Sequence, residues 1–437
     1  MTWLQKGWLW SFTLLMLLAQ PVLVVYLLWR ARRQPAYLRG WAQRFLAQVP
    51  IGHKGLAQTR RIWVHAVSVG ETHAISPLVK RWAEKYPDDV WMISSTTPTG
   101  RDAAMQQFGH LKGVQFFYLP YDLPWLMRRC IKRVNADQLW IVETELWPNL
   151  LAESFKSGLF TALINARVSP RTGRRLKKLR GLSEPGIGRI NAVICQTAAD
   201  AEVFQSLGRP VDAVSGNLKF DVPVHPSLVT LGQRWRDSLG ASSVLILASS
   251  RDGEEEKFLE AMERSQFFKR LPKVSVWIVP RHPQRCEEVY ELMRISSARL
   301  GVGTPKRRSQ FAEGEPVSFA NLFLGDSMGE MPAYYSLADV AMLGGSWEPF
   351  GGQNLIEACA HGCPVWMGPN TWNFAKAADD ACLAGAAVQF EDFPQAVAYF
   401  LDLDGRVAAD FSQQAKQFSL SHAGATEQTL AVLEKRR

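Results

Sequence analysis

Short apolar runs that alternate with helical patterns are the feature that most constrains what this chain can fold into. Each run is nearly continuous in apolar residues, and an amphipathic stretch fills each gap. Strands that are buried on both faces have such continuous runs, so the pattern predicts parallel sheets covered by helices. The runs form two sets, one over 61–67, 90–95, 114–119, 138–142, 160–164 and 192–195, and one over 244–248, 274–279, 321–324, 340–343 and 364–367.

A polar, proline-containing stretch over 216–226 separates the two sets and has the composition of a linker. The length of 437 residues agrees with two or three domains. We therefore predict an α/β protein with two Rossmann-like, doubly wound domains, over 34–220 and 221–437, that face a cleft. Ligands in such sheets bind outside the carboxyl ends of the strands, so functional motifs should directly follow strands.

The N-terminal region has no charged residue over 7–29, and tryptophan or tyrosine lies near each end of this stretch. A helix of this length crosses a hydrocarbon core of about 30 Å, which predicts one transmembrane helix in an anchor over 1–33. A buried core helix is the alternative. Lys6 precedes the stretch, whereas five arginines follow it, so the globular part should be cytoplasmic. These are Arg30, Arg32, Arg33, Arg39 and Arg44.

The formal net charge of +9 is unevenly distributed along the chain. Residues 1–225 have 29 basic and 15 acidic side chains (+14), whereas residues 226–437 have 21 and 26 (−5). The basic half favours an anionic partner, such as nucleic acid, a membrane surface or a phosphorylated substrate. The densest basic cluster in this half is either a phosphate- or membrane-binding surface or a solvated helix face. It consists of Arg167, Arg171, Arg174, Arg175, Lys177, Lys178 and Arg180.

The six cysteines contain no CxxC pair, which excludes a disulfide scaffold and favours a reducing compartment. Cys359 and Cys363 lie beside His361, but no second cluster of ligands accompanies them. Packing of small residues on a helix explains this group better than a metal site does.

Carboxylates follow two of the expected strands in the first set. Glu71 follows the run 61–67 at the start of a helical pattern, where it is either a general base or a first-turn glutamate that balances the helix dipole. Glu143 and Glu145 follow the run 138–142, and two residues that are two apart on a strand share a face. Pro148 suits the first turn of the next helix. We expect at least one carboxylate of the pair to be functional.

Three motifs with glycine or arginine follow strands of the second set. Arg281 lies between Pro280 and His282, and its planar guanidinium suits a phosphate. Gly329, in the segment 325–330, permits a close approach of the backbone to a ligand. The glycine-rich segment 344–352 leads to Asn354 at a helix start, which is an anion site, and to Glu357, which can accept hydrogen bonds from ribose hydroxyls. Together they favour a nucleotide ligand.

The order of these motifs resembles that of the 3-deoxy-D-manno-octulosonic acid (Kdo) transferase family, over essentially the whole chain. This family comprises membrane-anchored GT-B glycosyltransferases of lipopolysaccharide biosynthesis. The matching motifs are SVGE (68–71), TTPTG (96–100), LPYDLP (119–124), ETELWPN (143–149), NAR (165–167), GNLKFD (216–221), VPRHP (279–283), GDSMGE (325–330) and NLIE (354–357).

The resemblance implies transfer of Kdo from CMP-Kdo to the lipid A precursor lipid IVA at the cytoplasmic side of the inner membrane. It also implies inversion, no metal, no cofactor and no nucleic acid partner. The family's base corresponds to Glu71, and Glu145 is our second candidate catalytic residue. Arg251 departs from the pattern, because the family usually has histidine there. The implied CMP contacts are Pro280, Arg281, Met328, Gly329, Glu330, Asn354, Leu355, Ile356 and Glu357.

Two other functions fit the residues without the resemblance. A GT-B glycosyltransferase that uses a UDP-sugar on a membrane lipid would have the same two domains and a glycine-rich site. A non-catalytic, membrane-tethered nucleotide-binding protein would need no base, so turnover with and without Glu71 separates it from an enzyme.

Overall fold

The chain divides into two compact units in the computed structural model, which describes residues 3–52, 59–178, 181, 186–312 and 315–436. Unit 1 comprises Met1–Val222 and Ala423–Arg437, and unit 2 comprises Pro223–His422. The division after Val222 falls inside the segment that the sequence indicates as a linker. The last residues return to unit 1, so they do not stay with the domain expected over 221–437. The cleft between the domains stays a prediction.

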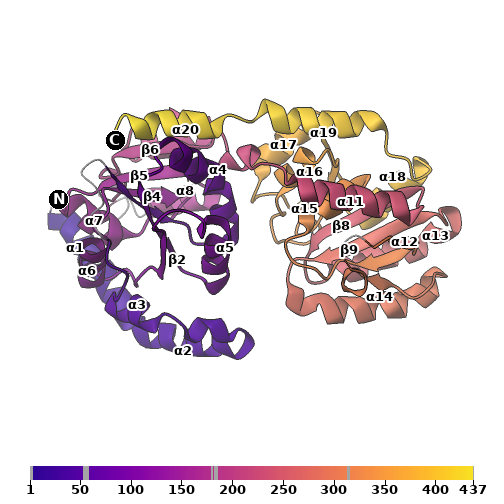
Figure 1. The fold of residues 1–437 in the computed structure, drawn as a ribbon, viewed down its shortest axis with the longest axis horizontal. Coiled ribbons are helices and arrows are strands. Elements are labelled where there is room, and N and C mark those ends of the chain that lie inside the picture. Colours follow the sequence, from indigo (N-terminus) through magenta and orange to yellow (C-terminus); the bar gives the residue numbers. More distant parts are fainter. Residues whose placement is uncertain (1–2, 53–58, 179–180, 182–185, 313–314, 437) are drawn as a thin grey trace. The chain divides into compact units, whose positions relative to one another are not determined.

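Unit 1 contains a sheet in the order β3-β2-β1-β4-β5-β6-β7, in which every neighbouring pair is parallel (Figure 1). All six expected strands of the first set are present, and the two-residue edge strand β7 adds to them. The strands are β1 (Arg61–His65), β2 (Val90–Ser95), β3 (Gln115–Tyr118), β4 (Gln138–Val142), β5 (Phe160–Ala166), β6 (Ala192–Cys195) and β7 (Ala213–Val214).

Helices cover both faces of this sheet, as expected for a doubly wound domain. Alternate strand residues pack to opposite faces: Val64 lies with α4, α5 and α20, whereas Trp63 lies with α6, α7 and α10. The helices of unit 1 are α1 (Trp3–Leu18), α2 (Gln20–Arg33), η1 (Pro35–Leu38), α3 (Trp41–Leu46), α4 (Val69–Lys85), α5 (Pro98–Phe108), α6 (Pro124–Val134), α7 (Pro148–Lys156), α8 (Pro170–Lys178), α10 (Ala198–Ser206), η2 (Leu218–Asp221) and α20 (Ala425–Glu434).

Unit 2 contains a second parallel sheet, in the order β10-β11-β9-β8-β12-β13-β14. The five expected strands of the second set are all present, and β10 and β14 extend the two edges. The strands are β8 (Ser243–Ser250), β9 (Val274–Pro280), β10 (Lys306–Arg307), β11 (Leu322–Leu324), β12 (Val340–Leu343), β13 (Val365–Met367) and β14 (Ala387–Gln389).

The core of unit 2 is rich in aromatic residues. Trp277 of β9 stacks on Phe323 of β11 with ring centroids 4.2 Å apart, and it also stacks on Trp235 of α11. The helices of unit 2 are α11 (Pro226–Leu239), α12 (Glu254–Arg264), α13 (Phe267–Arg270), η3 (Pro283–Arg285), α14 (Cys286–Leu300), η4 (Arg308–Gln310), α15 (Met331–Leu337), α16 (Leu355–Ala360), α17 (Ala375–Leu383), α18 (Phe393–Asp402) and α19 (Ala409–Ser421).

Each sheet has a central point at which the strand order reverses, and in unit 2 the edge strands β10 and β11 are also exchanged. In unit 1 this point lies between the neighbouring strands β1 and β4, and in unit 2 it lies between β8 and β12. The crevice outside the carboxyl ends of such a strand pair is the usual ligand site of doubly wound sheets. Glu71 follows β1 and Glu143 follows β4, whereas Arg251 follows β8 and Gly344 follows β12.

The N-terminal apolar stretch does not support the prediction of one single transmembrane helix. It forms two helices, α1 and α2, that are bent by 46° at the break between them. Pro21 lies in the first turn of α2, where its missing N–H and its ring interrupt a continuous helix. Within the described residues, no single helix is long and apolar enough to cross a membrane, although the bent pair has the length and composition to do so.

Candidate active site

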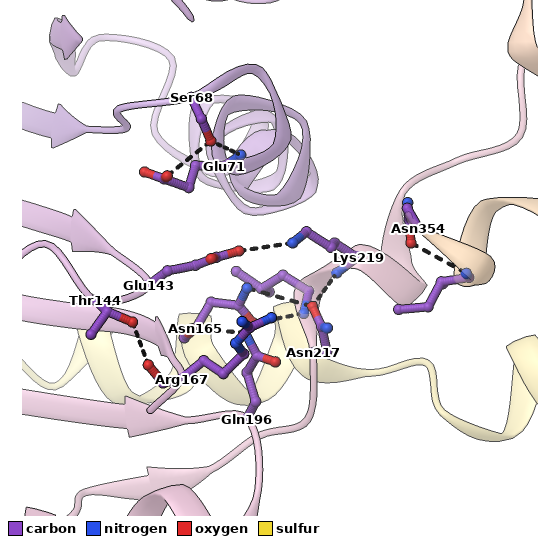
Figure 2. A network of polar contacts seen from close by, with 12 residues as sticks. Ser68, Glu71, Glu143, Thr144, Asn165, Arg167, Gln196, Asn217, Lys219 and Asn354 are labelled. Atoms are coloured by element: carbon purple, nitrogen blue, oxygen red, sulfur yellow. Dashed lines mark hydrogen bonds and ion pairs between the residues drawn. The ribbon is translucent and has the colours of Figure 1, made fainter. Parts of the chain in front are cut away.

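Glu71 lies in the first turn of α4, directly after the loop that leaves β1. Ser68 is the N-cap of this helix: its Oγ accepts from the Glu71 N–H at 3.2 Å and donates to Glu71 Oε1 at 2.9 Å. The N–H of Val67 donates to the other carboxylate oxygen at 2.7 Å. Glu71 therefore lies in the first turn of α4, where its charge can balance the helix dipole, as the simpler interpretation proposes. The same contacts hold the carboxylate at the end of β1 (Figure 2).

The pKa of Glu71 is unusually high for a glutamate. Its side chain is nearly buried, and this burial raises the pKa of Glu71 to about 8, with Glu143 and Glu145 adding to the effect. The hydrogen bonds from Val67 and Ser68 oppose the shift. A carboxyl group with a pKa near neutral has the proton affinity that a general base needs. The two roles that the sequence leaves open for Glu71, a general base and a first-turn glutamate that balances the helix dipole, are thus compatible in one side chain.

The segment after β4 does not continue as a strand, so the expectation that Glu143 and Glu145 share a strand face is wrong. Glu143 has a φ of +59°, which turns the chain away from the sheet. Glu145 accepts a hydrogen bond from Trp147 Nε1 at 2.9 Å, and burial raises the pKa of Glu145. Pro148 begins α7, as expected.

The segment 216–226 is more than a linker, because part of it belongs to this site. Lys219 Nζ lies 2.8 Å from Glu143 Oε1. Asn165, at the end of β5 with a φ of +55°, accepts a hydrogen bond from the Leu218 N–H at 3.0 Å. Figure 2 shows these side chains grouped beside Glu143. Sequence reasoning overlooked Lys219, although the polar composition of its segment and the two nearby acids were a usable signal.

The basic cluster of unit 1 lies mainly on α8. Arg174, Arg175, Lys177 and Lys178 are exposed on this helix. Arg180 lies outside the described residues. The preference for a phosphate or membrane surface at this cluster stays a prediction.

Arg281 directly follows β9 in unit 2 and is exposed, and Pro280 is the last residue of that strand. The Arg281 N–H donates to the Ser250 carbonyl at 3.0 Å, which ties the ends of β8 and β9 together. The guanidinium of Arg251 lies 4.4 Å from the centre of the Phe350 ring. His282 has its pKa lowered by burial and then by Arg251 and Arg281. Positive charge therefore accumulates at this edge of the sheet, which suits an anion.

The loop after β11 exposes Met328 and Gly329, whose φ of +79° gives this loop a sharp turn. The carboxylate of Glu330 has a partner within the protein that the sequence analysis did not foresee. Arg308 of η4 donates to both of its carboxylate oxygens at 2.9 Å, and the Arg308 guanidinium packs against Trp235 and Phe311. The sequence analysis missed Arg308, because it lies 22 positions before Glu330 and nothing in the sequence between them signals a pair.

The glycine-rich loop after β12 is organised by a carboxylate that the sequence analysis gave no role. Glu254 is fully buried, and its oxygens accept from the N–H groups of Arg251, Gly345, Trp347 and Glu348. These bonds join the loop after β8 to the loop after β12. The bonds therefore fix the two loops that follow β8 and β12, the neighbouring strands at which the strand order reverses.

Asn354 caps α16, and its Oδ1 accepts from the Ile356 N–H at 3.2 Å. Leu355 and Ile356 are buried. This helix has only six residues, so its dipole is weaker than the sequence analysis assumed. Burial raises the pKa of Glu357, and the positive charge of Arg281 opposes that shift, which places these two expected donor contacts near each other.

Comparison with known proteins identifies the family. The family described as 3-deoxy-D-manno-octulosonic-acid transferase (kdotransferase) matches residues 39–222. The 3-deoxy-D-manno-octulosonic acid transferase of Bordetella pertussis is 38% identical over 379 residues, which cover 85% of this chain and 86% of the relative. The chain belongs to the Kdo transferase family.

Other matches agree with this assignment. The Kdo transferase of Haemophilus influenzae is 30% identical and covers 84% of each chain. Members of this family are glycosyltransferases, so the chain is an enzyme of that class. A crystal structure of UDP-GlcNAc 2-epimerase from Neisseria meningitidis bound to UDP-GlcNAc has a TM-score of 0.57 at 13% identity and covers 86% of this chain and all of that one. This likeness shows the fold alone, a GT-B-like pair of parallel-sheet α/β domains.

Proposed function

We propose that this Kdo transferase moves Kdo from CMP-Kdo to lipid IVA in lipopolysaccharide biosynthesis, with Glu71 as the general base. One observation carries the proposal beyond family membership. Glu71 is fixed by three hydrogen bonds at the end of β1, where burial and two neighbouring acids raise its pKa to about 8. A glutamate that served as a cap alone would gain nothing from this environment.

On the acceptor side, the ionised Glu71 takes the proton of a lipid hydroxyl as that oxygen bonds to the anomeric carbon of Kdo. The bond between this carbon and the CMP phosphate oxygen breaks, and CMP leaves with the electron pair. Attack from the face opposite CMP inverts the configuration at the anomeric carbon. Glu145, which is held by Trp147, positions the acceptor or Glu71 rather than taking the proton.

On the donor side, Arg281 and Arg251 supply positive charge where the CMP phosphate and the Kdo carboxylate would bind. Their joint effect on His282 supports a common anion site at the ends of β8 and β9. Arginine at position 251 also suits this site, because a guanidinium binds two oxygens of an anion at once. The backbone of Met328 and Gly329 and the side chains of Glu330, Asn354 and Glu357 complete the proposed CMP contacts.

The acceptor is a diphosphorylated lipid, so the enzyme must work at a membrane surface. The exposed apolar residues of α1 and α2 support binding to the bilayer, and the exposed cations of α8 support binding to anionic headgroups. Together they favour an inner-membrane location with both units on the cytoplasmic side.

The test is turnover by full-length Glu71→Gln enzyme with CMP-Kdo and lipid IVA, followed by mass spectrometry of the lipid. We expect transfer to fall by about 10²–10⁴-fold while CMP affinity is kept. Glu84→Gln is the matched control, because Glu84 lies on the same helix and is exposed. A Glu71→Gln enzyme with a near wild-type rate would disprove the base, and inhibition by UDP rather than CMP would disprove the donor.

A further inference from the structure

A buried arginine that pairs with no carboxylate of the described residues lies on the short helix α3 of unit 1. Arg44 is 4% exposed, and its Nε and Nη2 have no hydrogen-bond partner within the described ranges. Burial lowers the pKa of Arg44, and the side chains that oppose this shift most are tyrosines rather than acids. They are Tyr121, Tyr118 and Tyr37. A buried charge without a counter-ion is destabilising, which favours an anion as the missing partner.

The two nitrogens without partners form the edge of the guanidinium that suits an oxyanion. Nε and Nη2 donate side by side in one plane, and in Arg308 this same edge binds the two carboxylate oxygens of Glu330. The Nε and Nη2 edge of Arg44 therefore has the geometry to bind two oxygens of one phosphate or carboxylate.

The acids near Arg44 along the chain do not fill this edge. The first acidic residue in the sequence is Glu71, so α1, α2, η1 and α3 contribute none. Asp122 lies in the loop after β3, but its two carboxylate oxygens accept from the N–H groups of Asn149 and Leu150 at the start of α7. An anion from outside the protein is therefore the partner that fits.

A second arginine contacts the same aromatic ring as Arg44. The guanidinium carbon of Arg44 lies 4.0 Å from the centre of the Tyr118 ring, and that of Arg101 lies 5.0 Å from it. Arg101 Nη2 donates to the Phe116 carbonyl at 3.5 Å, whereas its Nε is buried without a partner among the described residues. Gly40 makes room for the ring, because a Cβ there would overlap Tyr118. Two positive charges thus share one ring at the end of β3.

The two arginines lie at the same edge of the sheet as Glu71. β1, β2 and β3 are neighbouring parallel strands, Glu71 follows β1, Arg101 lies near the start of α5 after β2, and Tyr118 ends β3. Neighbouring strands are about 4.8 Å apart, so the ends of β1 and β3 are about 10 Å apart. The phosphorylated head of a lipid can span this distance. The site is also close along the chain to α2, which we propose binds the bilayer.

We propose that Arg44 and Arg101, around Tyr118, form a binding site for a phosphate group of the lipid acceptor. The inference rests on the proposed function, because it assigns a site to one group of the acceptor named there. The Nε and Nη2 edge of Arg44 binds two phosphate oxygens, and Arg101 adds a second positive charge. The edge of Arg44 is covered in this structure, so its side chain must turn to meet the phosphate. The bound phosphate then orients the lipid head while the lipid hydroxyl meets Glu71.

The experiment combines each protein variant with acceptors that lack one phosphate. KM for the acceptor and kcat are measured for the full-length wild type, Arg44→Met and Arg101→Met, with lipid IVA and with its two monophosphorylated forms. Each variant should raise KM for lipid IVA by about 10- to 100-fold and change kcat much less. One monophosphorylated form should show a similar rise with the wild type, and the variants should add little to it. Such non-additivity identifies the arginines and that phosphate as partners.

The controls separate binding of the phosphate from a structural effect. Arg39→Met removes an exposed arginine from the same segment, and its effect should not depend on the phosphates of the acceptor. Thermal unfolding of Arg44→Met should change little, because the variant also removes an uncompensated buried charge. If Arg44→Met does not fold, Arg101→Met and Arg44→Lys still test the proposal. Lysine keeps the charge but lacks the two-point edge, so Arg44→Lys should also raise KM for lipid IVA.

The inference is overturned if the variants raise KM equally for all three acceptors, or not at all, while the wild type transfers Kdo. Weaker binding of the variants to phosphatidylglycerol vesicles, with unchanged KM ratios between the acceptors, would assign the arginines to bilayer phospholipids and overturn it too. Failure of the wild type to transfer Kdo to lipid IVA is a separate outcome, because it removes the proposed function. Equilibrium binding of the three lipids to the wild type and to Arg44→Met would then still decide whether the site binds the phosphate.

Discussion

Arg308 and Glu330 form a two-point ion pair in which Nε and Nη2 of the arginine each donate to a different carboxylate oxygen at 2.9 Å. The arginine comes from η4, and the glutamate ends the loop 325–330 that we propose contacts CMP. The Arg308 side chain is 8% exposed, and Glu330 is 19% exposed. This relationship means that the shape of the proposed donor loop depends on a residue outside all of the sequence motifs.

Arg308→Ala should therefore weaken both the fold of unit 2 and CMP binding. Removing one partner of a largely buried pair leaves the other charge uncompensated, at a cost of about 3 kcal/mol. Thermal unfolding and calorimetric titration with CMP measure the two effects. Arg264→Ala is the control, because Arg264 pairs with Glu260 on the exposed face of α12. An unchanged CMP affinity in a folded Arg308→Ala enzyme would show that the loop keeps its shape without this pair.

The raised pKa of Glu71 predicts a pH profile with a definite sign. A base must be ionised, so kcat/KM should rise with pH, reach half its maximum near pH 8 and level off about one unit higher. Glu145→Gln removes a negative charge that raises the pKa of Glu71, so it should move the midpoint to lower pH. Glu84→Gln, on the same helix, should not move it. A wild-type profile that is flat between pH 6 and pH 9 would contradict the assignment of the base.

The sequence predicted most of the fold because its main signal is local. Continuous apolar runs indicated every strand of four or more residues, whereas the edge strands β7, β10 and β14, with two or three residues each, were not predicted. A single N-terminal helix is not supported by the structure, for a specific reason. Hydropathy registers the apolar length of the stretch but not the break at Ala19, where Pro21 interrupts the hydrogen-bonding pattern.

The candidate site was only partly predictable for a related reason. Glu71 could be found from the sequence, since a strand, a cap and a helix start are neighbours along the chain. Lys219 and Arg308 could not be assigned partners from the sequence. Lys219 lies 76 positions from Glu143, and Arg308 lies 22 positions from Glu330. The left-handed conformation of Glu143 was also invisible, since glutamate has no preference for it.

Arg281→Ala tests the proposed anion site of unit 2. A charge-assisted hydrogen bond to a phosphate contributes about 1.5–3 kcal/mol, so CMP affinity should fall by roughly 10- to 150-fold. Arg251→Ala should lower the affinity for CMP by a smaller factor. If Arg251 binds the carboxylate of the sugar, the same variant should lower the affinity for CMP-Kdo by a larger factor. Arg294→Ala, which removes an exposed arginine paired with Glu291, is the control. Unchanged affinity in Arg281→Ala would place the phosphate elsewhere.

Glu254→Gln should disrupt the glycine-rich loop, although it changes a single atom. Oε2 accepts from the N–H groups of Arg251 and Gly345 at 2.8 Å, and Oε1 accepts from those of Trp347 and Glu348 at 3.1 and 3.4 Å. The side-chain NH2 group of glutamine would replace one of these oxygens. Its N–H donors would then face two backbone N–H donors that have lost their acceptor. Leaving buried donors unsatisfied costs about 1–3 kcal/mol each, so unit 2 should lose roughly 2–5 kcal/mol of stability.

The matched control for this variant is Glu256→Gln, two residues along the same first turn of α12, where the side chain is exposed. It removes the same charge near the same helix N-terminus but leaves the four N–H groups satisfied. Denaturant unfolding should therefore separate the two variants, and CMP binding should weaken in Glu254→Gln alone. Equal stability of the two variants would mean that the charge of Glu254, rather than its hydrogen bonds to the loops after β8 and β12, is what matters at this position.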